Sequence, residues 1–251
     1  MRALIDGDIL LYRVGFATEN EDGEVAIYRI EETISRILEA TESTSYQIYL
    51  SAPREGTFRY ELNPDYKGNR KQPKPIHYQL LKDYLIQKYG AIVAVNEEAD
   101  DLLGIEQSSN EDTIIVSIDK DLLQIAGNHY NFVTKEFITI DEDEGRLFFY
   151  LQLLMGDKAD NIPGITGIGI AKATAILEPY LGEDDLTLFT LIQDKYRGWL
   201  QDFWADQGDW TEVQEKHMND VILLNGCMLK IRQKVGEIWE LPKKKEVVDV
   251  S

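Results

Sequence analysis

Short apolar runs that alternate with helical stretches are the feature that most constrains how this chain can fold. Turn residues bound each run, and the β-branched content favours strands at residues 3–5, 24–30, 47–50, 91–95, 113–118 and 130–133. Between them, helical periodicity is clear in the face formed by Ile34, Ile37 and Leu38. The pattern predicts an α/β fold with a mostly parallel central sheet flanked by helices.

The pattern changes after about residue 144. From there the chain is helical, with a Gly- and Pro-rich interruption at residues 157–169. We therefore predict an α/β core over residues 1–144 and a helical region over residues 145–251. In the helical region, Trp199, Trp204 and Trp210 are expected to pack against other helices rather than stack on ligands.

The charge of the chain is strongly negative but unevenly distributed. The 251 residues carry a net charge of −19, whereas residues 57–90 hold seven Lys or Arg against three carboxylates, a local net charge of +4. A polyanion would meet this basic segment. The single cysteine and three dispersed histidines offer no zinc-ligand spacing, so any metal ion must be bound by oxygen.

Four acidic groups follow predicted strands or helices. Each group alone has an ordinary explanation as a solvated turn or a helix cap. Together in one cleft they would repel one another, and divalent cations are the usual compensation. Oxygen ligands select two Mg²⁺ or Mn²⁺ ions, which suit phosphodiester hydrolysis. The groups are Asp6 and Asp8; Glu98, Asp100 and Asp101; Asp119 and Asp121; Asp157 and Asp160.

A glycine-rich turn at residues 162–169 precedes a predicted helix at residues 171–177. Closely spaced glycines let backbone N–H groups approach a phosphate, and the helix dipole adds attraction without net positive charge. Tight helix packing is the alternative explanation. The turn is not a dinucleotide fingerprint, because no strand directly precedes it.

Five motifs in order resemble the 5′-nuclease, or flap endonuclease-like, family. The sequence is most similar to its bacteriophage 5′-3′ exonuclease branch, with relatives in the nuclease domain of bacterial DNA polymerase I. The resemblance covers residues 2–178 and implies a PIN-like, 5′-nuclease fold. The motifs are Leu-Ile-Asp-Gly-Asp at 4–8, Tyr-Lys-Gly-Asn-Arg-Lys at 66–71, Glu-Ala-Asp-Asp at 98–101, Ser-Ile-Asp-Lys-Asp at 117–121 and Met-Gly-Asp-Lys-Ala-Asp-Asn-Ile-Pro-Gly with Gly-Ile-Gly at 155–169.

The resemblance implies roles for the acidic residues. Asp6, Glu98 and Asp100 would belong to the first metal site, with Asp101 supporting them. The second site would comprise Asp119, Asp121, Asp157 and Asp160.

The resemblance also assigns the DNA contacts. Lys67 and Arg70 match catalytic residues at the foot of an arch or clamp over residues 57–90, where they contact the scissile phosphate. Residues 155–177 match a helix-three-turn-helix, which grips the duplex backbone and in the family often binds K⁺. The expected DNA-binding residues are Tyr66, Lys67, Arg70, Lys71, Gly164, Gly167, Ile168, Gly169 and Lys172.

One residue departs from the family pattern. The strand before the basic motif usually ends in a metal-site aspartate, and this chain has Ser51 there. Asp8, a further candidate ligand, or a water bound by Ser51 could substitute. The segment after Lys71 is also short for a closed arch, which favours an open clamp.

Two other functions remain open from the sequence. A PIN-like ribonuclease shares the carboxylate pattern but not the glycine turn and basic motif. A catalytically weak or silent duplex-DNA clamp would explain Ser51. The resemblance implies action on DNA 5′ ends, flaps and junctions, on RNA–DNA hybrids in some members, beside replication proteins, as a monomer. A phage-encoded protein of this kind would work in the cytoplasm of a bacterial host during replication or primer removal.

Overall fold

The computed structural model describes residues 1–203 and 209–243, and Trp204 lies outside them. The chain divides into two units, residues 1–142 with 231–237, and residues 143–230 with 238–251. The sequence placed one division near residue 144 and did not anticipate that residues 231–237 return to the first unit. Within the described helices, none has the length and apolar character needed to cross a membrane.

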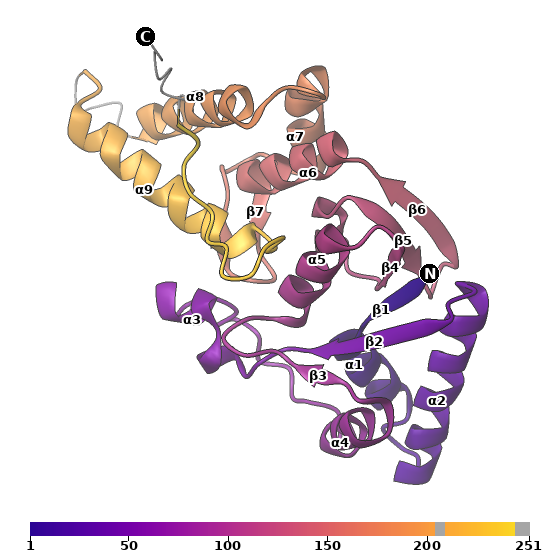
Figure 1. The fold of residues 1–251 in the computed structure, drawn as a ribbon. Coiled ribbons are helices and arrows are strands. Elements are labelled where there is room, and N and C mark those ends of the chain that lie inside the picture. Colours follow the sequence, from indigo (N-terminus) through magenta and orange to yellow (C-terminus); the bar gives the residue numbers. More distant parts are fainter. Residues whose placement is uncertain (204–208, 244–251) are drawn as a thin grey trace. The chain divides into compact units, whose positions relative to one another are not determined.

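The first unit is built around a six-stranded sheet (Figure 1). Its order is β3-β2-β1-β4-β5-β6; the first five strands pair in parallel and β6 is antiparallel. The mostly parallel sheet is therefore confirmed. The strands are β1 (Arg2–Asp6), β2 (Ser45–Leu50), β3 (Ile92–Val93), β4 (Thr113–Val116), β5 (Gly127–Asn131) and β6 (Glu136–Ile140).

Helices cover both faces of this sheet, as the alternation of side chains along β1 requires. Ala3 and Ile5 pack in one core with α1, α2 and α4, whereas Leu4 packs in another with α5. All three are fully buried. The helices are α1 (Gly7–Ala17), α2 (Gly23–Ala40), α3 (Phe58–Leu62), α4 (Tyr78–Tyr89) and α5 (Ala99–Ser109).

One predicted strand is wrong. Residues 24–30 lie inside α2, where Ala26, Ile30, Ile34 and Ile37 are buried at successive turns. This spacing of three and four residues places all four on one helix face, so the helical period overrides the β-branched content. The sequence also missed β6, an edge strand whose residues are mostly exposed.

The predicted arch segment is partly core. Leu81 and Leu85 of α4 are fully buried against α1 and α2, so α4 belongs to a helical layer. Only the turns and extended chain between α3 and α4 remain for a clamp. This agrees with a short, open segment rather than a long arch.

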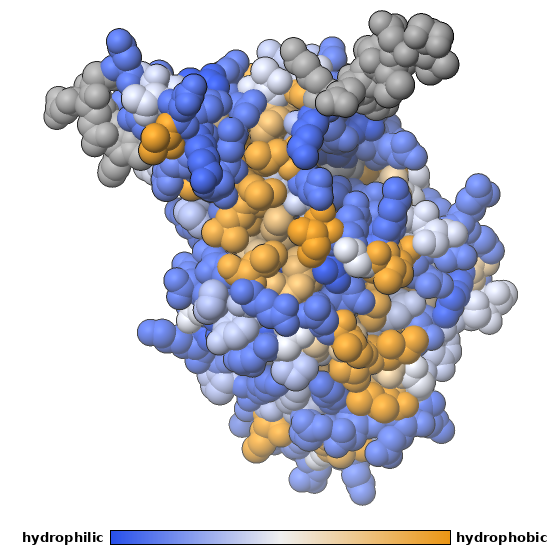
Figure 2. Space-filling view, turned by 60° about the vertical axis from the view of Figure 1, so that its left-hand side comes forward, coloured by the Kyte–Doolittle hydropathy of each residue, from blue (hydrophilic) through white to orange (hydrophobic). Residues whose placement is uncertain are grey.

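The second unit is helical, apart from a two-stranded β7–β8 ribbon. Tyr196 packs edge-on against Trp199, and Trp210 donates an indole N–H to Glu215 at 2.7 Å, so both tryptophans make packing contacts. The face in Figure 2 carries many hydrophilic residues, with hydrophobic residues gathered among them along its middle. The elements are α6 (Glu142–Met155), β7 (Gly156–Asp157), β8 (Ile162–Pro163), α7 (Ile170–Leu177), α8 (Asp185–Phe203) and α9 (Glu212–Leu229).

Candidate metal and DNA site

Asp6 lies where β1 becomes α1, at the centre of the sheet. One carboxylate oxygen accepts the Ile9 N–H at 3.1 Å and caps α1; the other accepts the Ser117 hydroxyl at 2.7 Å. Because β1 lies between β2 and β4, Asp6 is at the switch point of the strand order, where sites of α/β sheets collect.

Asp8 lies beside Ser51, the residue that departs from the family pattern. The Asp8 carboxylate accepts the Ser51 N–H at 3.1 Å, and the Ser51 hydroxyl accepts the Ala99 N–H at 2.9 Å. Ser51 therefore connects the N-termini of α1 and α5. The Asp8 carboxylate occupies the region just past β2, where the missing aspartate was expected.

Glu98 lies at the N-terminus of α5, where its carboxylate accepts hydrogen bonds from three side chains. Its Oε2 accepts the Tyr66 hydroxyl at 2.8 Å and an Arg59 N–H at 3.2 Å, and its Oε1 accepts Lys67 Nζ. Burial alone would raise the pKa of Glu98, but Lys67 and Arg59 outweigh it and lower that pKa.

Asp101 forms a buried bidentate ion pair that sequence reasoning missed. Arg59 contacts both carboxylate oxygens at 2.6 and 2.9 Å, and the two side chains are 3% and 0% exposed. Asp101 also accepts the Glu98 and Arg232 N–H groups at 3.1 Å. It therefore holds the Glu98 backbone in place, and its role beside a metal site stays a prediction. No local signal marks the partners, which are 42 residues apart.

Asp119 follows β4. Its N–H donates to the Ser117 hydroxyl at 3.0 Å, and one carboxylate oxygen accepts the Asp121 N–H at 2.9 Å. Ser117 therefore joins the ends of β1 and β4 through Asp6 and Asp119, although sequence reasoning assigned it no role.

The carboxylates in this region act on one another. Burial, followed by the charge of Asp8, raises the pKa of Asp6 to about 7, and Asp119 adds to the effect. Burial, followed by the charges of Asp6 and Asp119, raises the pKa of Asp100 well above its usual range. Burial also raises the pKa of Asp8. Concentrated negative charge in a poorly solvated place is what a divalent cation relieves.

The donor set fits magnesium or manganese, since every candidate atom is a carboxylate oxygen. Within residues 1–203 and 209–243, however, no three His, Cys, Asp or Glu side chains converge closely enough to bind one ion. Glu98 is one reason, because its carboxylate is held by Tyr66, Arg59 and Lys67.

The remaining predicted ligands lie in the second unit. Asp157 ends β7 and accepts the Ala159 N–H at 2.7 Å, while Asp160 is buried. Asp6, Asp100 and Asp119 belong to the first unit. A shared metal site stays a prediction.

The glycine turn shows the close backbone packing that the sequence offered as an alternative explanation, and its phosphate contacts stay a prediction. A Cβ on Gly164 would lie 2.0 Å from the Met155 carbonyl carbon, so only glycine lets these backbones approach. Gly167 has a φ of +82°, in the left-handed region. Gly169 caps α7, with Ile168 before it and Lys172 in the first turn.

The basic motif forms a turn fixed by Arg54, which donates to the carbonyl oxygens of Tyr66 and Pro64 at 2.6 and 2.5 Å. One predicted DNA contact needs correction. Tyr66 is only 3% exposed and its hydroxyl donates to Glu98, so its ring is unavailable to DNA. Arg70 and Lys71 are exposed in the same turn region.

Residues 1–147 match the 5′-3′ exonuclease, N-terminal resolvase-like domain. The chain belongs to the 5′-3′ exonuclease family. It is 31% identical over 200 residues to the 5′-3′ exonuclease of Buchnera aphidicola subsp. Schizaphis graminum, which covers 70% of this chain and 69% of that protein.

In some longer relatives the similarity covers only one part of the protein. The chain is 33% identical over 206 residues to DNA polymerase I of Bacillus caldotenax, covering 70% of this chain but only 23% of that protein. Among solved structures, the bacteriophage T5 D15 flap endonuclease in a pseudo-enzyme–product complex with DNA and metal ions matches with a TM-score of 0.62 at 17% identity, over 91% of this chain and 88% of that one. That likeness supports the fold of this 5′-3′ exonuclease family member.

Proposed function

We propose that this chain is a divalent-metal-dependent 5′-nuclease, which hydrolyses phosphodiester bonds near DNA 5′ ends as an exonuclease or a flap endonuclease. The observation that carries the proposal is the gathering of Asp6, Asp100 and Asp119 at the strand ends of a family member, where burial and their mutual charge raise the pKa of Asp6 and Asp100. A protein that bound DNA without catalysis would gain nothing from this mutual repulsion.

The first-unit carboxylates Asp6, Asp8, Asp100 and Asp119 would hold Mg²⁺ or Mn²⁺, with Glu98 joining them. Asp121 would serve a second ion, for which Asp157 and Asp160 of the second unit stay the predicted further ligands. Two such ions would activate a water and stabilise the leaving oxygen of an in-line displacement. A solved structure of similar fold, the T5 D15 flap endonuclease complex, contains DNA and metal ions.

Lys67 connects the metal site to the substrate in this proposal. Lys67 Nζ contacts Glu98 Oε1, while Arg59 and Tyr66 hold Oε2. Glu98 would help to hold the metal ion, and Arg59 would keep its carboxylate ionised and oriented. Lys67, in the basic turn, would contact the scissile phosphate. Arg70, in the same turn, would contact the same phosphate.

The second unit would grip the duplex. Backbone N–H groups at Gly164, Gly167, Ile168 and Gly169, together with Lys172, would bind phosphates of one strand. Carbonyl oxygens of the turn would coordinate K⁺. Such contacts recognise the backbone rather than base sequence. Lys71 would add a contact from the basic turn.

The test is release of labelled 5′ product from a flap duplex, a blunt duplex and a single strand, each with Mg²⁺ and with EDTA. We expect magnesium-dependent release that Asp119→Ala abolishes. Glu111→Gln, an exposed change ahead of the same strand, is the matched control. Product in EDTA, or from Asp119→Ala at the wild-type rate, would overturn the proposal.

Ser51 favours one second function, a silent duplex clamp, because it lacks the carboxylate that the family usually has at this position. That function predicts duplex binding without product in any metal. Products from an RNA–DNA hybrid in the same assay would extend the substrates to primers and support a role in phage-type replication.

A further inference from the structure

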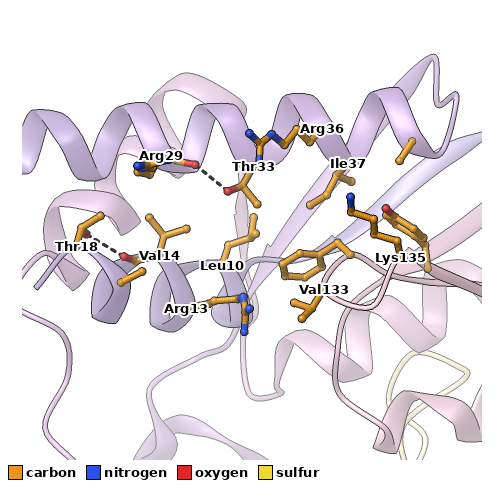
Figure 3. Close-up of a pocket in the computed structure, with 14 residues that line it drawn as sticks. Leu10, Arg13, Val14, Thr18, Arg29, Thr33, Arg36, Ile37, Val133 and Lys135 are labelled. Atoms are coloured by element: carbon orange, nitrogen blue, oxygen red, sulfur yellow. Dashed lines mark hydrogen bonds between the residues drawn. The ribbon is translucent and has the colours of Figure 1, made fainter.

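A cavity of about 630 Å³ opens in the first unit, away from the carboxylates. Its walls are α1, α2 and the end of β5 with the turn that follows it (Figure 3). Its size is that of a small-molecule site. Neither the sequence motifs nor the proposed nuclease chemistry gives this cavity a role.

The charge of the cavity opposes that of the chain. Arg13, Arg29, Arg36 and Lys135 line it, and none of its 14 lining residues is acidic. In the whole chain Asp and Glu outnumber Lys and Arg by 45 to 26. A pocket with four cations and no carboxylate therefore differs in charge from the average of this chain. Such a pocket selects an anion.

Two of the four cations, Arg13 and Lys135, have charge available for a ligand, whereas the other two are paired with a carboxylate. Arg29 and Arg36 share Glu32, at 3.2 and 2.7 Å. Within the described part of the chain, neither Arg13 nor Lys135 has an ion-pair partner.

Lys135 belongs to a turn whose backbone is held by hydrogen bonds. Its N–H donates to the Asn131 carbonyl oxygen at 2.7 Å, and the Asn131 side chain accepts the N–H groups of Val133 and Thr134 at 3.0 Å. Little backbone ordering would therefore accompany binding at Lys135.

Most of the other lining residues are apolar. Val133, which is 40% exposed, is one of them, and Leu10 and Ile37 lie buried behind the wall. The hydroxyls of Thr18 and Thr33 already donate to the carbonyl oxygens of Val14 and Arg29, both at 2.8 Å (Figure 3). The wall thus offers apolar contact and cations but few free donors.

We propose that this cavity binds a nucleoside 5′-monophosphate, with the base against the apolar wall and the phosphate between Arg13 and Lys135. The choice among anions with an apolar body rests on the proposed function, since a 5′-nuclease releases such nucleotides. The site shares α1 with Asp6 and Asp8 but not their chemistry, because it contains cations instead of carboxylates.

The test is calorimetric titration of the full chain with dAMP in EDTA and without DNA, so that neither metal binding nor catalysis contributes. We expect one saturable site with a dissociation constant of about 0.1 mM. Arg13→Glu and Lys135→Glu should each weaken binding by about tenfold, as expected for lost charge-assisted contacts. Lys216→Glu, an equal change on an exposed position of α9, should leave it unchanged.

Three outcomes would overturn this inference. Inorganic phosphate binding as tightly as dAMP would mean that the apolar wall is unused. Laurate binding in place of dAMP would assign the cavity to an acyl anion. Loss of single-stranded DNA binding in Arg13→Glu, without dAMP binding in the wild type, would assign it to a nucleic-acid strand. The nuclease assay is independent, and Arg13→Glu should cleave flap DNA at the wild-type rate.

Discussion

Glu98 and Asp101 differ sharply from Asp6 and Asp100, although all four are carboxylates of one region in the first unit. Arg59 pairs with both of the first two and Lys67 with Glu98, and these cations lower the pKa of each carboxyl against the effect of burial. For Asp6 and Asp100, burial and neighbouring carboxylates raise the pKa, and the described residues provide no ion pair.

Burial alone therefore does not decide the charge of a carboxylate. Arg59 and Lys67 supply positive charge to Glu98 and Asp101 at the N-terminus of α5. Asp6 and Asp100 have no such ion pair among the described residues, so protons or the proposed metal ions would neutralise them.

Replacing Asp100 should have the largest effect and should separate activity from stability. We expect Asp100→Asn to lower cleavage about 10³-fold, because a metal ligand is lost. In EDTA the same variant should be more stable by about 1 kcal/mol, because repulsion with Asp6 is removed. Single-turnover cleavage and urea unfolding measure the two effects. A variant less stable than wild type in EDTA would contradict the comparison.

Removing Arg59 should show the opposite behaviour. Arg59→Ala leaves the Asp101 charge buried without its partner and should destabilise the protein by about 3 kcal/mol. Urea unfolding measures the loss, with Arg36→Ala, whose side chain is 72% exposed, as the control. The double variant Arg59→Ala/Asp101→Asn should recover part of the stability. If Arg59→Ala matched the control, the ion pair would have no structural role.

Exchanging residues across the Asp8–Ser51 contact tests which position supplies the carboxylate. Asp8→Asn should weaken Mn²⁺ binding about tenfold, measured by electron paramagnetic resonance. Adding Ser51→Asp should restore it, because the new carboxylate lies where Asp8 meets the end of β2. Asp8→Asn with unchanged Mn²⁺ affinity would show that Asp8 only supports the N-terminus of α1.

The smallest effect concerns His129, which lies outside the carboxylate region. Burial lowers its pKa below the usual value of 6.5, while its Nε2–H donates to the Ile125 carbonyl oxygen at 2.7 Å. The unfolded chain takes up this proton first, so stability should fall as pH drops below about 6.5. The loss should be about 1 kcal/mol by pH 5, measured by urea unfolding in EDTA. His129→Gln should lack it; an unchanged pH profile would show that His129 is protonated when folded.

Much of the first unit was predictable because its signals are local. Apolar runs and their flanking turns located β1, β2, β3 and β4, and acidic residues followed three of these strands. Parallel strands end at the same edge, so Asp6 and Asp119 could be expected near each other from their positions in the chain. The glycines at Gly164 and Gly167 were likewise predictable, since close backbone approach and positive φ leave few alternatives.

Contacts between distant segments required the tertiary structure. Residues 24–30 resembled a strand in the sequence. In the structure they belong to a helix whose buried face they share with Ile34 and Ile37. From the sequence, Arg59 was only one charge of a basic segment, whereas in the structure it pairs with Asp101. Tyr66 was an expected DNA contact, whereas in the structure its hydroxyl donates to Glu98. The order of residues is enough to show which positions carry charge and where strands are expected to end. Only the folded chain shows which charges are paired, because burial and distance set each carboxylate's pKa and neither can be read from a local stretch of residues.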